Sequence, residues 1–343
     1  MGNAIIEQVP LGSQWPMIDP FLFCAHHNDL YPPGTNDLGP VGGTAGRNIG
    51  SDFSGKDGWS MYHGTVVPGF PMHPHRGFET ITFARRGLID HSDSLGAAAR
   101  FGRGDVQWVT AGAGISHSEM FPLLDHEAPN HFELFQIWLN LPAASKMVAP
   151  HFTMLWSEDI PTVTFTDANG QTTTVTVIAG QLNGVEPPSP PPESWAANPA
   201  SDVAIWHLVL DPSAEWVLPP AAAGSVRTLY VFDGSTLEID GDTVTAGTGA
   251  VVDAARPVDL AAGSGGVEVL LLQGRPLAEP ISRYGPFVMN TRAEIEQAFR
   301  DYERTRFGAW SWDSLDPVHG TEQRRFARYP DGTIDTRGVS TPN

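Results

Sequence analysis

Cysteine is almost absent from this chain of 343 residues, since Cys24 is the only one. One cysteine excludes an intramolecular disulfide, which favours an intracellular protein. The chain also lacks any run of eighteen apolar residues, so we expect no membrane-spanning helix. Residues 1–17 have neither the basic start nor the apolar core of a signal peptide. These absences together predict a cytoplasmic protein.

Basic residues are scarce as well, with 20 Lys and Arg against 39 Asp and Glu and a net charge of -19. Direct binding of nucleic acid needs a basic surface, so this balance argues against it. No glycine-rich loop stands in the strand–helix context that nucleotide binding requires, and no Gly-x-Ser-x-Gly nucleophile turn occurs. The sequence therefore disfavours these enzyme classes.

Glycine and proline are abundant, at 36 and 30 residues, and they separate many short alternating segments. Short strands at regular spacing with glycine turns indicate an all-β barrel or sandwich. The clearest predicted strands cover residues 78–83, 88–93, 106–109, 115–120 and 131–141. The same rhythm resumes after a proline-rich stretch at 185–200, in residues 204–210, 227–232 and 267–272. This repetition predicts two similar β-domains, over residues 1–180 and 200–308.

Three other segments complete the expected organisation. Residues 30–60 are rich in Gly, Pro, Asn and Asp and predict a long irregular loop. Thr291 and Glu294 form a capping box that begins a short C-terminal helix, which we expect to end at Gly308. Residues 309–343 are polar and turn-rich, and we expect them to be a tail that lies on the surface.

The feature that points to chemistry is a pair of histidine clusters about forty residues apart. His73 and His75 are spaced i, i+2, and so are His117 and Glu119. On a strand, side chains at this spacing point to one face, so two such strands can aim three imidazoles and a carboxylate at one point. Nitrogen and oxygen ligands of this kind suit a divalent transition metal, iron in particular where coordination positions stay open. Pro74 lacks a backbone N–H, so its strand should be an edge strand or carry a bulge.

The spacing leaves the identity of the oxygen ligand open. Glu79 follows His75 by four residues and competes with Glu119 for this position, and the unused carboxylate could hydrogen-bond an imidazole. We interpret His91, Asp93, His126 and His131 as polar surface or strand-edge residues. His26 and His27 are candidates for lining the cleft, although a loop position is the simpler interpretation. Phe70, Phe78 and Trp108 are candidates for an apolar pocket, and Arg76 for binding an anionic substrate or for a surface ion pair.

The chain resembles the pirin family of the cupin superfamily at several places. The resembling segments are residues 19–22 (DPFL), 70–80 (FPMHPHRGFET), 104–120 (GDVQWVTAGAGISHSEM), 139–142 (LNLP) with Lys146 and Met147, and 284–291 (YGPFVMNT). The resemblance implies two tandem cupin barrels of jelly-roll type with one metal in the N-terminal barrel. It also implies His73, His75, His117 and Glu119 as the ligands. The loop at 30–60, the proline-rich linker and the tail depart from the family pattern.

Two functions follow from this resemblance. The first is a dioxygenase that uses a non-haem metal, Fe(II) or else Mn, Ni, Cu or Zn, to cleave the flavonol quercetin with dioxygen, with Glu119 as both ligand and proton acceptor. The second is a non-enzymatic regulator that senses redox state through iron and binds a transcription-related protein partner. Consumption of quercetin by the metal-loaded protein distinguishes the two.

Overall fold

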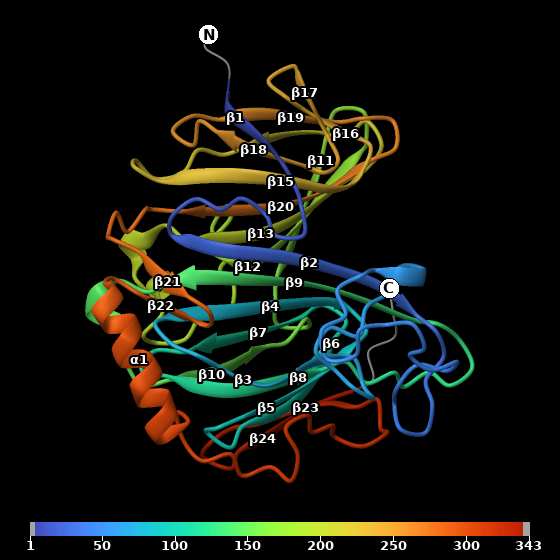
Figure 1. Ribbon diagram of the computed structural model, residues 1–343. Coiled ribbons are helices and arrows are strands. Elements are labelled where there is room, and N and C mark those ends of the chain that lie inside the picture. The colour runs from blue at the N-terminus through green and yellow to red at the C-terminus, as the bar shows by residue number, and fades with distance from the viewer. Residues whose placement is uncertain (1–3, 339–343) are drawn as a thin grey trace. The chain divides into compact units, whose positions relative to one another are not determined.

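A computed structural model describes residues 4–338 of the chain. Within these residues the chain forms five sheets with antiparallel strand pairs, and one α-helix, α1 (Arg292–Thr305). The all-β class with a short C-terminal helix is therefore confirmed (Figure 1). Among the described residues, no helix has the length and apolar character needed to cross a membrane. The chain divides into two compact units, each described below by itself.

The first β-unit contains residues 26–137, 141–157 and 279 onward. Its five-stranded sheet has the order β10-β7-β4-β9-β2, and its six-stranded sheet the order β24-β23-β6-β5-β8-β3. The strands of the first sheet are β2 (Phe21–Tyr31), β4 (Phe78–Arg86), β7 (Asp105–Thr110), β9 (Asn130–Asn140) and β10 (His151–Leu155). Of β2 and β9, residues 26–31 and 130–137 belong to this unit. Those of the second are β3 (Gly69–His75), β5 (Leu88–Asp93), β6 (Ala98–Gly102), β8 (Ile115–Met120), β23 (Arg325–Arg328) and β24 (Ile334–Arg337).

The core of the first β-unit joins side chains from both of these sheets. It includes Ile89 and Phe101 from the six-stranded sheet and Val109, Phe152 and Met154 from the five-stranded sheet. Because side chains alternate along a strand, residues two apart from these core positions also point inward. This rule places polar residues inside the unit, where the candidate site lies.

One tight turn adjoins each of the two strands that carry the histidine clusters. Gly77 has φ +85°, and a Cβ there would lie 2.0 Å from the carbonyl oxygen of Val288. Gly112 has φ +48°, and a Cβ there would lie 2.3 Å from the carbonyl oxygen of Val148. Both positions need glycine because no side chain fits the conformation or the space. The first turn ends β3 at His75, and the second leads from β7 into β8.

The short helix begins as the sequence predicts. Thr291 is the N-cap and forms the capping box with Glu294, which is typically worth about 1 kcal/mol. The helix ends at Thr305 with Arg306 in the left-handed conformation, three residues before the predicted stop at Gly308. Apolar residues of α1 pack against the hairpin of β21 (Ser282–Tyr284) and β22 (Phe287–Met289). Figure 1 shows α1 beside this hairpin.

The C-terminal segment is not the peripheral tail that its composition suggests. Strand β23 pairs with β6, with Phe326 opposite Arg100. The Arg325 side chain is fully buried, and its Nη1 lies 2.5 Å from Oδ1 of Asp105. The segment thus extends the six-stranded sheet of the first β-unit. By contrast, the predicted irregular stretch at 30–60 is confirmed beyond β2, where the only helical element is the 3-10 turn Lys56–Gly58.

The second β-unit contains residues up to 25, 138–140 and 158–278. Its seven-stranded sheet comprises β1 (Ile5–Pro10), β11 (Thr162–Thr166), β12 (Thr172–Ala179), β13 (Ala204–Leu210), β15 (Val226–Gly234), β18 (Thr248–Val252) and β20 (Val267–Gly274). Its four-stranded sheet comprises β14 (Glu215–Leu218), β16 (Thr236–Ile239), β17 (Asp242–Thr245) and β19 (Val258–Ala262). Short 3-10 turns lie at Ala143–Ser145, Trp195–Ala197 and Pro199–Ser201.

Strand pairing determines where the chain passes between the units. The N-terminal strand β1 pairs with β18, and β12 pairs with β13, so both ends of the predicted first domain join the second β-unit. Residues from 279 onward belong to the first β-unit. The proline-rich stretch at 185–200 lies within the second β-unit, so the prediction that it links the two domains is wrong. Composition marks the stretch but does not reveal the long-range pairings that decide which unit it belongs to.

Candidate metal centre

Two adjacent strands of the six-stranded sheet carry the predicted ligands. His73 and His75 lie on β3, and His117 lies on β8 directly opposite His73. Strand β3 is at the end of its sheet, and the register shifts between Phe70 and His73. The prediction from Pro74 was an edge strand or a bulge, and the edge position is confirmed, since a residue without an N–H cannot complete an inner ladder. Pro74 itself pairs in regular register with Ser116, and the irregularity lies before His73.

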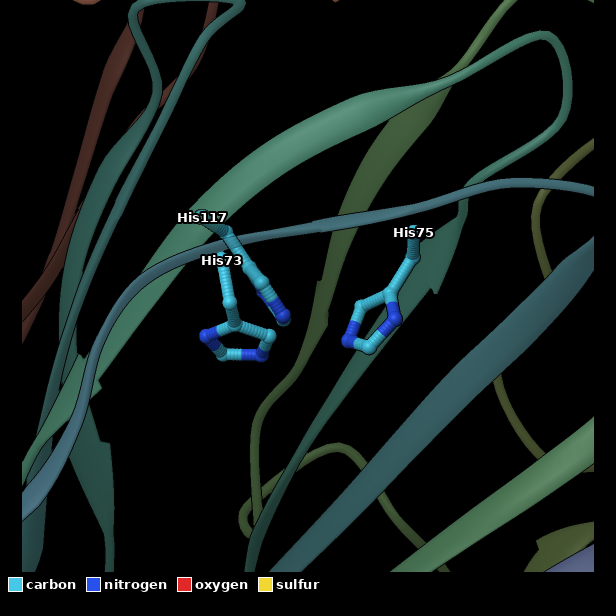
Figure 2. A group of neighbouring side chains, drawn as sticks. All are labelled: His73, His75 and His117. Atoms are coloured by element: carbon cyan, nitrogen blue, oxygen red, sulfur yellow. The ribbon is translucent and has the colours of Figure 1, made fainter. Parts of the chain in front are cut away.

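The three imidazoles converge inside the first β-unit. One ring nitrogen from each of His73, His75 and His117 lies within 4.8 Å of the others. Their ring centroids are 4.5 to 4.9 Å apart. Figure 2 shows the three rings turned toward the space between them. Nitrogen ligands about 2.1 Å from one ion lie at most about 4.2 Å apart, so small ring rotations would bring all three onto a cation.

The protonation state of these rings suits metal binding. Nδ1 of His73 lies 2.9 Å from the carbonyl oxygen of Pro71, which can only accept, so Nδ1 carries the proton and Nε2 keeps its lone pair. Both ring nitrogens of His117 are buried and have no hydrogen-bond partner within residues 4–338. Burial lowers the pKa of His73 to about 4 and the pKa values of His75 and His117 well below their ordinary value. Neutral imidazoles with unused nitrogens fit a divalent transition metal.

Glu119 lies on the same face of β8 as His117. Its carboxylate is not part of the cluster in which the three imidazole nitrogens lie within 4.8 Å of one another. Its Oε1 accepts from Oγ1 of Thr82 at 3.1 Å, and its Oε2 accepts from Nε2 of Gln136 at 2.9 Å. Burial raises the pKa of Glu119, and these two hydrogen bonds offset part of that rise. Thr82 and Gln136 have no distinguishing pattern in the sequence, so only the fold reveals that they orient this carboxylate.

Glu79, the rival carboxylate, faces elsewhere. The turn at Gly77 ends β3, so Glu79 belongs to β4 and does not share a strand face with His75. Its Oε1 accepts from Nε1 of Trp108 at 3.2 Å and from Oγ1 of Thr110 at 2.7 Å. The sequence argument assumed one continuous strand and was wrong on this point. On β7, Val109 points into the core, so its neighbour Trp108 points to the opposite face of the sheet, where it contacts Glu79.

His91 and Asp93 are fully buried, contrary to the prediction of surface or strand-edge residues. The His91 ring centroid lies 5.5 Å from that of His117, and its Nε2 lies 3.1 Å from Oδ2 of Asp93. Strand β5 pairs with β8, with Asp93 opposite His117 and His91 opposite Glu119. These two residues therefore lie directly beside His117 and Glu119.

Most of the other sequence candidates are engaged elsewhere. Nδ1 of His126 lies 2.9 Å from the carbonyl oxygen of Gly34, and Nε2 of His131 lies 2.8 Å from Oδ1 of Asn28. Nε2 of His26 lies 2.9 Å from Oε1 of Glu133. His27 lies on β2, as does His26, and not in a loop. Arg76 is buried, and its Nη1 donates to Oδ2 of Asp301 at 2.9 Å, so it forms an internal ion pair and is not a surface residue.

The lowered histidine pKa values give a testable pH dependence. An unshifted imidazole is only about one-tenth neutral at pH 5.5, so three of them would weaken metal binding about 1,000-fold between pH 7.5 and 5.5. Burial lowers the pKa of His73 to about 4 and lowers the pKa values of His75 and His117, so the three rings stay neutral at pH 5.5. We therefore expect the affinity for Mn²⁺ to fall less than about tenfold between pH 7.5 and 5.5. Competition with a metal indicator measures it.

The raised pKa of Glu119 acts in the other direction, because a protonated carboxyl group binds metal poorly. If the affinity for Mn²⁺ declines at low pH in the unchanged chain but not in Glu119→Gln, the decline is therefore due to Glu119 and not to the imidazoles. A 1,000-fold decline that persists in Glu119→Gln would show that the imidazoles titrate as they do in water.

Comparison with known protein families gives two matches along the chain. Residues 5–139 match the family model described as Pirin, and residues 205–308 match the Pirin C-terminal cupin domain. Two proteins of Pseudomonas aeruginosa named "Putative quercetin 2,3-dioxygenase" are 37% and 39% identical over 239 and 246 residues. The alignments cover 70% and 69% of this chain and 79% of each relative.

A solved structure of quercetin 2,3-dioxygenase from Acinetobacter baumannii is similar to this chain with a TM-score of 0.70 and 26% identity. The similarity covers 89% of this chain and 98% of that one. The predicted fold of two tandem cupin barrels is therefore confirmed.

Proposed function

Because this chain belongs to the pirin family, we propose that it is a metal-dependent dioxygenase that cleaves a flavonol, quercetin, with dioxygen. The observation that carries the proposal is the convergence of three neutral imidazoles within 4.8 Å, on the same inward side as a buried glutamate. A closed structural site would use cysteine and leave no open position, whereas this site has no cysteine ligand. It suits turnover better than a purely structural role.

His73, His75 and His117 would hold the metal together with Glu119, once its carboxylate turns toward the rings. Iron(II) is our proposed ion, and manganese, nickel, copper or zinc could bind the same nitrogen and oxygen ligands. When bound, the metal would supply Lewis-acid polarisation and a common binding point for substrate and dioxygen. The carbonyl of Pro71 accepts from Nδ1 of His73, so Nε2 keeps its lone pair and would be the nitrogen that binds a metal.

Glu119 is our proposed proton acceptor for the flavonol hydroxyl group. Burial raises its pKa, which makes its carboxylate a stronger base than an exposed glutamate. Thr82 and Gln136 each donate to one of its oxygens and leave a second lone pair on each. The two donors would keep the carboxylate oriented while it takes and returns the proton.

Aromatic side chains beside the histidines support an aromatic substrate. The Phe70 ring lies 6.3 Å from that of His73 and stacks on Tyr62 at 5.2 Å. Phe53, from the long irregular segment, lies 6.4 Å from Phe70 and is 55% exposed. Planar aromatic ligands stack favourably on such rings. The segment that departs from the family pattern thus adds a ring surface next to the site.

The test is quercetin consumption under oxygen by the iron-loaded chain. We expect turnover that disappears on metal removal, and a fall in kcat of about 100-fold or more in Glu119→Gln, since general-base catalysis commonly contributes 10²–10⁴-fold. Glu127→Gln is the matched control, because Glu127 is an exposed glutamate in the same unit. Absorbance loss of quercetin measures the rate, and elemental analysis measures bound metal.

Absence of turnover with the iron, manganese, nickel, copper and zinc forms would reject quercetin as substrate. Full activity in Glu119→Gln would instead retain the dioxygenase and remove Glu119 as the base.

A further inference from the structure

The second β-unit contains a cavity of about 350 Å³ that is open to solvent. Trp206, Arg227 and Gln273 line it, and each belongs to a different strand of the seven-stranded sheet. Each lies two residues from side chains of the apolar core, Leu208, Leu229 and Leu271, so all three point inward. The volume lies in the range of pockets that bind small molecules.

Arg227 is a buried cation with spare hydrogen-bond donors. Its side chain is 1% exposed and forms no ion pair among the described residues, and the charge of Asp202 acts on it only at longer range. Its Nε and Nη2 donate to Oε1 of Gln273, and its Nη1 donates to the carbonyl oxygen of Pro219 at 2.8 Å. A guanidinium group has five N–H donors, so two lack an acceptor. Burial lowers the pKa of Arg227 to about 10, which reflects incomplete compensation of its charge.

Trp206 adds a further unused donor to the same cavity wall. Its side chain is 3% exposed, and its buried indole N–H finds no acceptor in the part of the chain that the structure describes. A buried tryptophan usually finds a partner for this group, because an unmet donor costs free energy.

Asp202 also lines the cavity, but its Oδ2 is already occupied. It accepts from the backbone N–H of Ala222 at 2.9 Å, from Oγ of Ser225 at 2.6 Å and from Nε2 of Gln273 at 3.0 Å. Gln273 therefore stands between the carboxylate and the guanidinium group. At Arg227 and Trp206, three N–H donors therefore have no acceptor among the described residues.

A group that only accepts hydrogen bonds would satisfy these donors, and a carboxylate matches the planar fork of arginine. The net charge of -19 disfavours a multiply charged ligand such as phosphate. Leu182 and Pro219 line other parts of the cavity, where they could contact the apolar part of a ligand. We propose that this cavity of the second β-unit binds a small organic monocarboxylate through Arg227 and the indole N–H of Trp206.

The experiment uses the full chain labelled with ¹⁵N-tryptophan and benzoate as the probe. Ten tryptophans give ten indole resonances, and Trp206→Phe identifies the one from Trp206. We expect benzoate to move this resonance downfield in a saturable manner. Benzamide has nearly the same shape without the charge and should leave it in place. Arg227→Gln should weaken benzoate binding at least tenfold, because it removes the charge.

Arg275→Gln is the matched control, since it removes an equal charge from the same unit at a residue outside the cavity lining. An equal response to benzamide, or no movement with benzoate up to about 10 mM, overturns the proposal. Equal weakening by Arg275→Gln also overturns it, because the effect would then be one of net charge. If Arg227→Gln does not fold, the comparison of benzoate with benzamide on the unmodified chain decides.

Discussion

His75→Ala is expected to lose nearly all bound metal. Changing a group that merely supports a ligand typically weakens metal binding 10- to 100-fold, so removal of a direct ligand should exceed about 100-fold. His75 supplies one of the three ring nitrogens that lie within 4.8 Å of one another. Two imidazoles and a carboxylate that must first reorient would remain. Elemental analysis after dialysis against dilute Fe(II) or Mn²⁺ measures the loss.

The matched control is His151→Ala, at an exposed histidine on β10 in the same unit. It should keep the metal content of the unchanged chain. Metal retained at full stoichiometry in His75→Ala would remove His75 from the ligand set. Because this readout is independent of turnover, it tests the site even if quercetin is not the substrate.

The histidine site was predictable because its signal is local. The i, i+2 spacing of His73 and His75 becomes a shared strand face as soon as β3 forms, and Pro74 marks the edge. The capping box at Thr291 is equally local and correctly begins α1. Features of this kind depend on a few neighbouring residues, which the sequence shows directly.

Other parts of the site depend on pairings between distant strands. His91 is buried beside His117 only because β5 pairs with β8, and its own neighbours in sequence look like a strand edge. Thr82 reaches Glu119 across 37 positions of the chain. Glu79 was misplaced because one turn at Gly77 changes which face it occupies. No composition or spacing rule encodes such contacts.

A substitution in the C-terminal segment is expected to lower the stability of the first β-unit strongly. Arg325→Met is expected to destabilise the first β-unit by about 3–5 kcal/mol, because it leaves Asp105 charged, buried and without its cation. Oδ1 of Asp105 lies 2.5 Å from Nη1 of Arg325, and both side chains are fully buried. For a unit of this size the change corresponds to a fall in Tm of about 10 °C. Thermal unfolding followed by circular dichroism measures it.

The neighbouring residue provides a nearly ideal control. The Arg324 side chain is 61% exposed, and its Nη2 lies 3.7 Å from Oε2 of Glu322, an exposed pair worth at most about 1 kcal/mol. Arg324→Met should therefore change Tm by only a few degrees, although it removes the same charge one position earlier. Equal Tm values for the two variants would show that β23 is not anchored through Asp105. A large difference would establish that residues beyond α1 are part of the fold that surrounds the histidines.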